Sequence, residues 1–381
     1  MHECSVYLVD GGFPGDLPGF SRGIPSASFP FWGSYCLLDF AAMNFAHLDK
    51  RGYTVFADSR YRSLLPFITS RGRQDRETLV FLDEGLERLV DTVRSDPAET
   101  ILLCPLTLVC DLDRHVLNSA IENRKAPIVK LSIRKVETDI YLARREALVD
   151  ALESYGKRHT LSRRLSTALF SQVLRSSFEA IQDIPGRILF QNNLTQLFKE
   201  NLWLVGQKGR VEVLSRLFRP EKTSSSAKAT IIEKEGHVKN SLLAPGARIE
   251  GYVEGSFIFP DVVVHRGASV VNSVLMNGNR IGGKAQLCKT LVLPYLGDLG
   301  SSNIGENTRI GMQEAGARNF DYPKQIREGV TVLGINAEVP KGYKIGPGCL
   351  VGARVGPQQL RSIKELTRSS SVVRAEEAEQ G

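Results

Sequence analysis

Residues 333–352 read LGINAEVPKGYKIGPGCLVG, and in this stretch Leu333, Val339, Ile345 and Val351 stand six residues apart. A glycine or proline directly follows each of these four aliphatic residues. An α-helix repeats its apolar face every 3.6 residues and a β-strand every 2, so neither element explains a period of six. Hexapeptide repeats have this period, because each repeat forms one short strand and one corner of a β-helix. The stretch therefore predicts a β-helix whose aliphatic side chains point into the coil.

The same period recurs upstream, with one slip of a residue and one break. Its earlier members are Ile258, Val264, Val270 and Met276, then Ile281, Leu287 and Leu293, then Ile304 and Ile310. An ordinary Val- and Gly-rich β domain is the alternative, but it does not account for a fixed period over several turns. We expect the β-helix over residues 230–357, with residues 312–329 as a loop inserted between coils.

Composition is that of an ordinary globular protein. The 381 residues are 42% hydrophobic and 24% charged, with a formal net charge of +7. No apolar run approaches the roughly 18 residues that a membrane-spanning helix needs. Basic and acidic residues alternate, which fits anionic small molecules as well as it fits nucleic acid. The N-terminal MHECSVYLVDGG has no basic region before a long apolar core, so we expect a cytoplasmic protein.

The six cysteines form no C-x-x-C pair, and most of them lie in apolar, strand-like segments. This pattern favours buried, reduced thiols over disulfides or a zinc site. The cysteines are Cys4, Cys36, Cys104, Cys110, Cys288 and Cys349.

The first part of the chain alternates short apolar strands with helical stretches, which predicts an α/β domain with a mainly parallel sheet. The predicted strands are Ser5–Val9, Thr54–Ala57, Thr78–Phe81 and Thr100–Leu103, and the predicted helices are Asp39–Leu48 and Glu84–Arg94. Residues 141–220 have largely helical spacing. We therefore expect an α/β domain over 1–222, a polar linker over 223–229 and a polar tail over 358–381 after the β-helix.

A glycine-rich turn follows the first predicted strand. Gly11, Gly12 and Gly15 stand where backbone N–H groups can approach a phosphate at the start of a helix, although tight turns use glycine for steric reasons too. Residues 25–40 then read PSASFPFWGSYCLLDF, in which prolines and aromatic residues lead into a helix that Asp39 is expected to cap.

At these residues the chain resembles bacterial glucose-1-phosphate adenylyltransferase, also called ADP-glucose pyrophosphorylase. PFWGSYCLLDF is similar to the P-F-G-G-[KR]-Y-R-[IL]-I-D-F segment of that family, and Asn44 fits the S-N that follows it. Residues 237–276 resemble the start of the family's β-helix. PSASFPFWG matches the P-V-A-S-L-P-F-G-G segment of the regulatory-type subunit without a gap. The resemblance implies a Rossmann-like nucleotidyltransferase domain, here abbreviated, followed by a left-handed parallel β-helix.

The chain departs from the family at the three places that hold the substrates. Where active members read G-G-x-G-x-R-L, Pro14 replaces the third glycine and Asp16 replaces the arginine. Ile24 stands at the phosphate-binding lysine of R-A-K-P, and Leu106 or Thr107 stands at the metal-binding carboxylate of S-G-[DN]-H. Proline removes an N–H donor, and neither an alkyl group nor a hydroxyl replaces a carboxylate on magnesium.

Asp111 and Asp113 follow closely and are candidate replacement ligands, although carboxylates after a strand more often cap a helix or lie in solvent. The sugar side is reduced as well, because residues 114–140 contain no E-K-P and residues 186–190 retain little of Y-W-x-D-[IV]-G-T.

Three arginines, Arg22, Arg210 and Arg216, are candidates for binding a phosphorylated effector, because regulatory subunits of the family use basic residues in these areas. The alternative for each is a solvated arginine on a helix.

A hexapeptide β-helix also occurs in acyltransferases that use a corner histidine as general base. His237 and His265 lie in the repeat region, and we expect both to be surface residues because no placed partner is visible in the sequence. Trp32 and Trp203 are expected to be core or interface aromatics.

Taken together, the resemblance and the departures predict a non-catalytic, regulatory-type subunit acting in ADP-glucose and glycogen synthesis. The alternative is an active sugar-1-phosphate nucleotidyltransferase with altered ligands. We expect no catalytic residue, metal or other cofactor, with Mg²⁺ required if activity is retained. The expected partner is a second copy or a catalytic subunit of the family, with no nucleic acid and no membrane.

Overall fold

The computed structural model describes residues 4–10, 19–20, 25–33, 35–45, 47–48, 52–58, 62, 79–82, 85–159, 168–191, 193–206, 228–297, 301–311, 318–367 and 369–374. The chain divides into two compact units that are interleaved in sequence. The first comprises residues 1–12, 23–29 and 37–191, and the second comprises residues 13–22, 30–36 and 192–381.

The first unit is built on a seven-stranded sheet. Its strands are β1 (Cys4–Asp10), β4 (Thr54–Ala57), β5 (Leu79–Phe81), β6 (Thr100–Pro105), β8 (Ile128–Ile133), β9 (Val136–Arg144) and β10 (Ala180–Ile184). Their order is β10-β8-β9-β6-β1-β4-β5. The pairs β1–β4, β1–β6, β4–β5 and β8–β10 are parallel, whereas β9 runs antiparallel to β6 and β8. The expected mainly parallel sheet is therefore present, with one antiparallel strand inside it.

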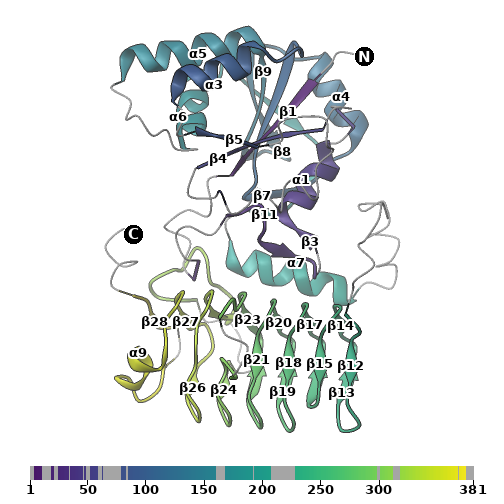
Figure 1. Ribbon diagram of the computed structural model, residues 1–381, viewed down its shortest axis with the longest axis vertical. Helices are drawn as coiled ribbons and strands as arrows, with labels where there is room; N and C mark the ends of the chain where they lie inside the picture. The colour runs from purple at the N-terminus through teal and green to yellow at the C-terminus, as the bar shows by residue number, and fades with distance from the viewer. Residues whose placement is uncertain are drawn as a thin grey trace. The chain divides into compact units, whose positions relative to one another are not determined.

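Helices cover both faces of this sheet (Figure 1). One group consists of α3 (Leu86–Arg94), α5 (Arg145–Arg158) and α6 (Ala168–Ser177), and the other of α1 (Leu37–Phe45) and α4 (Arg114–Glu122). The first group buries Leu89, Leu148 and Phe170 against Tyr7 and Ile101 of the central strands. Strands buried on two faces read as continuous apolar runs, which is why the sequence located β1, β4, β5 and β6.

Two parts of the sequence prediction are wrong in this unit. Residues 141–144 belong to β9, and residues 180–191 form β10 and β11 (Arg187–Gln191) rather than helix. Tyr141–Ala143 are buried on both sides of the strand, and such a run has no strand period to detect. Asp39 does not cap α1, because that helix already begins at Leu37 and Asp39 lies in its first turn.

The second unit contains three parallel sheets among its described residues. One sheet is β12 (Ile231–Ile232), β15 (Arg248–Ile249), β18 (Val263–Val264) and β21 (Arg280–Ile281). The next is β13 (His237–Lys239), β16 (Tyr252–Glu254), β19 (Ser269–Val271), β22 (Gln286–Cys288), β24 (Arg309–Ile310) and β26 (Lys344–Ile345). The third is β14 (Leu242–Leu243), β17 (Phe257–Ile258), β20 (Val274–Leu275), β23 (Thr290–Val292), β25 (Thr331–Leu333), β27 (Leu350–Val351) and β28 (Ser371–Val372).

The chain visits the three sheets in turn, and successive visits stack as the coils of a β-helix (Figure 1). Aliphatic residues pair in register from coil to coil and fill the interior, for example Val253 with Val270 and Val270 with Leu287. The hexapeptide prediction is confirmed, while the left-handed sense of the coil stays a prediction. Met276 and Leu293 are buried, yet Leu275 and Val292 hold the interior positions, so the predicted period is displaced by one residue there.

Buried hydroxyl side chains form a ladder of hydrogen bonds along one corner of the coils, separate from the aliphatic stack. The hydroxyl of Ser256 accepts a hydrogen bond from Ser273 N at 3.0 Å, and the hydroxyl of Ser273 accepts one from Thr290 N at 3.1 Å. Each hydroxyl also donates to a carbonyl two residues earlier, as Ser273 does to Val271 O at 2.8 Å. These buried hydroxyls satisfy backbone groups that the corner would otherwise leave unpaired.

Other segments pack against the coils. Helix α7 (Leu194–Gly206) lies along β17 and β20 (Figure 1), and the hairpin of β2 (Pro30–Phe31) and β3 (Tyr35–Cys36) belongs to the same unit. The described part of the expected insertion, residues 318–329, is a loop between coils, as predicted. The coil also continues past residue 357, because a short helix α9 (Pro357–Arg361) leads to Leu366 and Val372, which join the interior.

We predict that Ser273→Ala lowers the free energy of unfolding by about 1–3 kcal/mol, because Thr290 N loses its acceptor in a buried corner and Val271 O keeps only its bond from Lys289 N. Urea unfolding followed by circular dichroism measures the change. Ser269→Ala, on the outer side of the same coil, is the control and is expected to change stability by less than about 0.5 kcal/mol. Equal losses in the two variants would contradict the role of the hydroxyl ladder.

Candidate functional site

The candidate site is the carboxyl edge of β1 and β6 in the first unit, where open α/β sheets bind their ligands. The two strands run parallel and end beside each other, with Val9 paired to Pro105. We call the described residues of this edge, Asp10, Ser26, Ala27, Leu106 and Thr107, the strand-end site.

Asp10 is the best-held residue of the strand-end site. Its side chain is fully buried and accepts hydrogen bonds from Ser26 N at 3.0 Å, Ser26 Oγ at 2.7 Å and Ala27 N at 2.9 Å. Both carboxylate oxygens therefore serve to fix the turn that follows residue 25. Charge-assisted bonds of this kind hold a backbone segment firmly. The sequence analysis missed Asp10, although an acidic residue ending an apolar strand before glycines is the signal that marks it.

The neighbouring strand end offers no charge. Leu106 is fully buried, and its N–H donates to Val9 O at 3.0 Å. Thr107 completes the turn between β6 and β7 (Leu108–Asp111). The position that the resemblance assigns to a metal-binding carboxylate is therefore occupied by an inward alkyl group and a hydroxyl.

Neither nearby aspartate replaces that carboxylate at the strand end. Asp113 is the N-cap of α4 and accepts from His115 N at 2.8 Å and Val116 N at 3.4 Å, so the capping alternative is confirmed for it. Asp111 lies on β7 opposite Arg187 of β11 in the antiparallel pair. Opposite charges at directly opposed positions of an antiparallel pair attract each other. Gly186 precedes this pair and packs against Leu112, where a Cβ would lie 2.5 Å from a side-chain carbon.

Behind the strand-end site, Asn44 ties α1 to β7. Its side-chain amide donates to Cys110 O at 2.5 Å and accepts from Leu112 N at 3.3 Å. Cys104 and Cys110 lie beside this link and are fully buried. Burial raises the pKa of the Cys110 thiol to about 12 and raises the pKa of Cys104 well above its usual value. Both thiols therefore stay protonated at neutral pH, as expected for structural cysteines.

Most predicted site residues lie outside the described residues. These are Gly11, Gly12, Gly15, Asp16, Arg22, Ile24, Arg210 and Arg216. The predicted positions that the structure describes are Leu106, Thr107, Asp111 and Asp113. The glycine loop and the effector arginines accordingly stay predictions.

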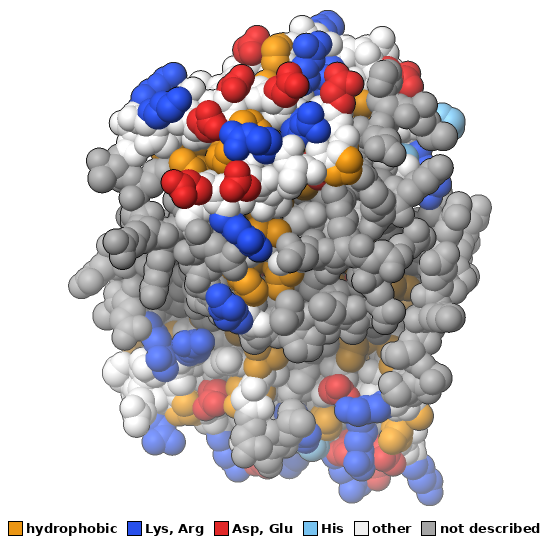
Figure 2. Space-filling model, turned by 45° about the horizontal axis from the view of Figure 1, so that its top comes forward, with side chains coloured by type: hydrophobic (Ala, Val, Ile, Leu, Met, Phe, Trp, Pro, Cys, Tyr) orange, Lys and Arg blue, Asp and Glu red, His pale blue; other side chains and the backbone are white. Residues whose placement is uncertain are grey.

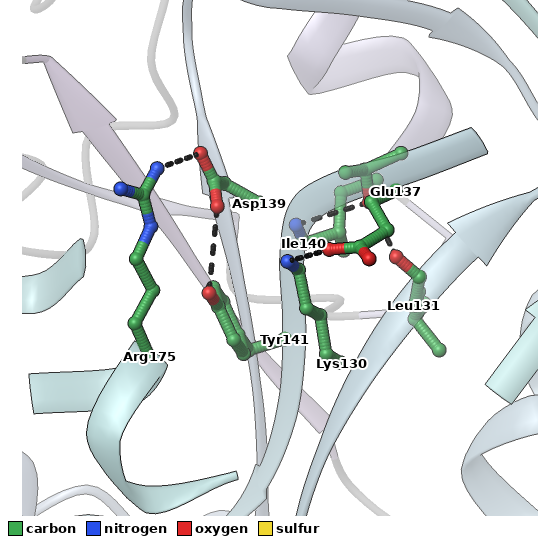
Figure 3. A network of polar contacts seen from close by, with 8 residues as sticks. Lys130, Leu131, Glu137, Asp139, Ile140, Tyr141 and Arg175 are labelled. Atoms are coloured by element: carbon green, nitrogen blue, oxygen red, sulfur yellow. Dashed lines mark hydrogen bonds and ion pairs between the residues drawn. The ribbon is translucent and has the colours of Figure 1, made fainter. Parts of the chain in front are cut away.

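A polar network on β8, β9 and α6 is the other concentration of charge that we tested as a site (Figure 3). Lys130 Nζ lies 2.6 Å from Glu137, and Arg175 donates to Asp139 at 2.9 Å. The Tyr141 hydroxyl donates to Asp139 at 3.4 Å, and burial, then the charge of Asp139, raise the pKa of Tyr141 to about 12. Each charge has an opposite partner, and the Arg175–Asp139 pair links the β8–β9 hairpin to α6.

A groove of about 550 Å³ lies between α5 and α6 and is lined by Ile128, Asp150, Tyr155 and Arg158 among others. Ile128 begins β8, which runs in the same direction as β6 because both are antiparallel to β9. The groove is therefore at the amino edge of the sheet, opposite the strand-end site, and does not extend it.

The outer surface of the coils carries balanced charge. His265 is 36% exposed and lies 3.3 Å from Glu250, which also pairs with Arg248 at 3.1 Å. His237 is exposed on β13. Both histidines are surface residues as predicted, although His265 has a carboxylate partner that the sequence did not reveal. In the view of Figure 2, Lys/Arg and Asp/Glu side chains are interspersed over the coloured, described residues.

No cluster of three or more His, Cys, Asp or Glu residues suited to a metal ion occurs within the described ranges. Over the same ranges, no helix has the length and apolar character needed to cross a membrane.

Comparison with known proteins supports the hexapeptide assignment and the resemblance described above. Residues 225–333 match the family model described as GlmU-like, C-terminal hexapeptide. Curated relatives include a glucose-1-phosphate adenylyltransferase of Acetivibrio thermocellus, 32% identical over 151 residues, which are 40% of this chain and 34% of that protein. A second, of Fervidobacterium nodosum, is 23% identical over 92% of this chain and 96% of its own length. The glycogen biosynthesis protein GlgD of Geobacillus stearothermophilus is 25% identical over 64% of this chain and 76% of its own length.

An α/β unit with helices on both sheet faces, joined to a hexapeptide β-helix, defines the class of protein. Within that class, the chain is similar to glucose-1-phosphate adenylyltransferases and to GlgD, at modest identity. The match to the Acetivibrio relative spans about a third of that protein's length.

We predict that Asp10→Asn destabilises the first unit by about 2–3 kcal/mol. The buried carboxylate accepts hydrogen bonds from three donors, and the amide of asparagine would place its own N–H group against one of them. Faster hydrogen exchange in residues 25–29 is the measurement, because that turn is what Asp10 holds. Asp91→Asn, at an exposed ion pair with Arg94, is the control and should cost less than about 1 kcal/mol. Unchanged exchange in Asp10→Asn would refute the anchoring role.

We also predict that iodoacetamide at pH 8 leaves Cys104 and Cys110 unmodified in the folded protein. Alkylation requires the thiolate, and burial keeps the pKa of both thiols above this pH. Peptide mass spectrometry should show both cysteines modified after unfolding in urea, with half-buried Cys288 reacting slowly in the folded state. Rapid native labelling of Cys110 would show that the region behind the strand-end site is open.

Proposed function

We propose that the chain is a non-catalytic, regulatory-type member of the glucose-1-phosphate adenylyltransferase family that acts in ADP-glucose and glycogen synthesis. The observation that carries this proposal is the strand-end site, where buried Leu106 and half-buried Thr107 stand at the position that the resemblance assigns to a metal-binding carboxylate.

The chemistry of the family reaction explains why this position matters. A sugar 1-phosphate attacks the α-phosphate of a nucleoside triphosphate, so one anion approaches another and catalysis depends on cations and a metal clamp. The capping bonds of Asp113 and the cross-strand position of Asp111 opposite Arg187 give these carboxylates other roles. The sequence departures Pro14, Asp16 and Ile24 would also weaken phosphate binding.

The similarity to GlgD supports the proposed role in glycogen synthesis. The Geobacillus protein is named for glycogen biosynthesis, and it matches this chain over 76% of its own length. The segment PSASFPFWG resembles the regulatory-type subunit without a gap. In this proposal the first unit is a degenerate Rossmann-like nucleotidyltransferase domain, the coil is left-handed, and the chain works in the cytoplasm as part of an oligomer with itself or with a catalytic subunit. A phosphorylated effector would bind near Arg22, Arg210 and Arg216.

We predict that the purified chain alone releases pyrophosphate from ATP and glucose 1-phosphate, with Mg²⁺ present, at least about a thousandfold more slowly than a catalytic relative, because the groups that hold metal and phosphates act as one unit. A coupled pyrophosphate assay measures the rate, with the Acetivibrio enzyme as the parallel control. Mixing the chain with a catalytic subunit from its own organism should change the substrate concentration dependence of that subunit. Turnover of the isolated chain at the control rate would establish the active transferase instead.

A further inference from the structure

Phe320 is the most exposed large hydrophobic side chain among the described residues, with 78% of its surface accessible. It lies in the loop between coils, residues 318–328, which we call the Phe320 loop. Exposing an aromatic ring to water is unfavourable, and a held, exposed aromatic is typical of the anchors at protein interfaces.

The Phe320 loop is fixed to the last coils through Asn319, which is fully buried. The Asn319 side chain donates to Gly348 O at 2.9 Å and accepts from Tyr322 N at 2.9 Å. The Phe320 N–H itself donates to Ser369 O at 2.8 Å. The exposed ring is therefore presented by a backbone that is hydrogen-bonded on both sides of it, so ordering it for binding costs little entropy.

The same loop is also fixed to helix α7. Thr195 N donates to Gln325 O at 3.0 Å, and Arg327 N donates to the Thr195 hydroxyl at 2.8 Å. Lys199 pairs with Glu328 at 2.5 Å. Bonds to two separate parts of the second unit make the loop a rigid platform.

The charged residues of the Phe320 loop are mostly basic. Arg318, Lys324 and Arg327 are exposed, and no ion pair holds their side chains within the part of the chain that the structure describes. The loop has two acidic residues, Asp321 and Glu328. Glu328 pairs with Lys199, whereas no ion pair holds Asp321 within the described residues. A basic loop that carries an exposed aromatic anchor complements an apolar pocket bordered by acidic residues.

We infer that the Phe320 loop is the surface with which this chain docks a catalytic subunit of its family, with Phe320 entering an apolar pocket that acidic residues surround. This inference rests on the proposed function. A second copy of the chain fits less well, because each copy carries a net charge of +7 and like charges oppose association.

The test co-expresses the chain with a glucose-1-phosphate adenylyltransferase of the same organism that retains the complete G-G-x-G-x-R-L loop. Native mass spectrometry reports the assembly, and biolayer interferometry reports its Kd. Phe320→Ser should weaken the hetero-complex by about 30-fold or more, the loss expected of an interface anchor. Leu296→Ser, at a side chain that is 67% exposed in the same unit, is the matched control and should leave the Kd within about twofold.

A charge reversal tests the acidic rim separately. Lys324→Glu should weaken the hetero-complex by about tenfold at low salt and reduce the dependence of association on ionic strength. Circular dichroism and the melting temperature should be unchanged in both loop variants, because the two side chains are exposed.

The possible outcomes separate this inference from the proposed function. If the unmodified chain forms no complex with the catalytic subunit, the proposed function fails and the inference fails with it. If the complex forms and Phe320→Ser leaves it intact, the inference is wrong while the proposed function stands. If Phe320→Ser instead dissociates a homo-oligomer and spares the hetero-complex, the loop binds a second copy and the inference is overturned.

Discussion

The in-register stacking of parallel coils is the constraint on which the second unit depends. Each coil supplies about one aliphatic side chain per sheet, and Val253, Val270 and Leu287 show how these meet directly from coil to coil. A short strand of two or three residues is not stable alone, so each coil requires its neighbours to bury its interior face. The corners matter as much as the strands. A corner with unpaired, buried N–H and C=O groups would lose the free energy that burial of the interior side chains provides. The ladder of Ser256, Ser273 and Thr290 answers that requirement.

A buried carboxylate has the corresponding role in the first unit. Asp10 ends the central strand and directs both of its oxygens into the turn after residue 25, rather than toward a ligand. The edge at which a nucleotidyltransferase would gather its cations is thus organised by a charge whose hydrogen bonds are internal. Such an edge can keep the fold intact after the reacting groups have changed, because the anchor does not depend on them.

The sequence predicts most strongly where a period is enforced by packing, and less well where burial hides it. The hexapeptide period located most interior residues of the coils. It failed at Met276 and Leu293, because the interior positions there belong to the preceding residues, Leu275 and Val292. All four side chains are buried and apolar, so the sequence did not distinguish them. The last four residues of β9, 141–144, were predicted as helix because Tyr141–Ala143 are buried on both faces of the strand. At the candidate site, the uncharged strand end at Leu106 and Thr107 was predictable from motif positions. The role of Asp10 was not, since it arises from a turn that begins sixteen residues later in the chain.

Trp32 shows how the structure accommodates a departure from the segment that the chain resembles. It stands where the resembling segment has the first of two glycines, and its backbone keeps a left-handed φ of 51° that favours glycine. That conformation costs a large side chain about 1–2 kcal/mol. The cost is offset locally, because Trp32 is buried, stacks on Trp203 with ring centroids 5.9 Å apart, and donates its indole N–H to Glu200 O at 3.0 Å. A glycine there could make none of the side-chain contacts, so the tryptophan joins the hairpin of β2 and β3 to helix α7 in a way that the motif residue could not. The same helix holds the Phe320 loop through Thr195, so the hairpin and the loop are both fixed to α7.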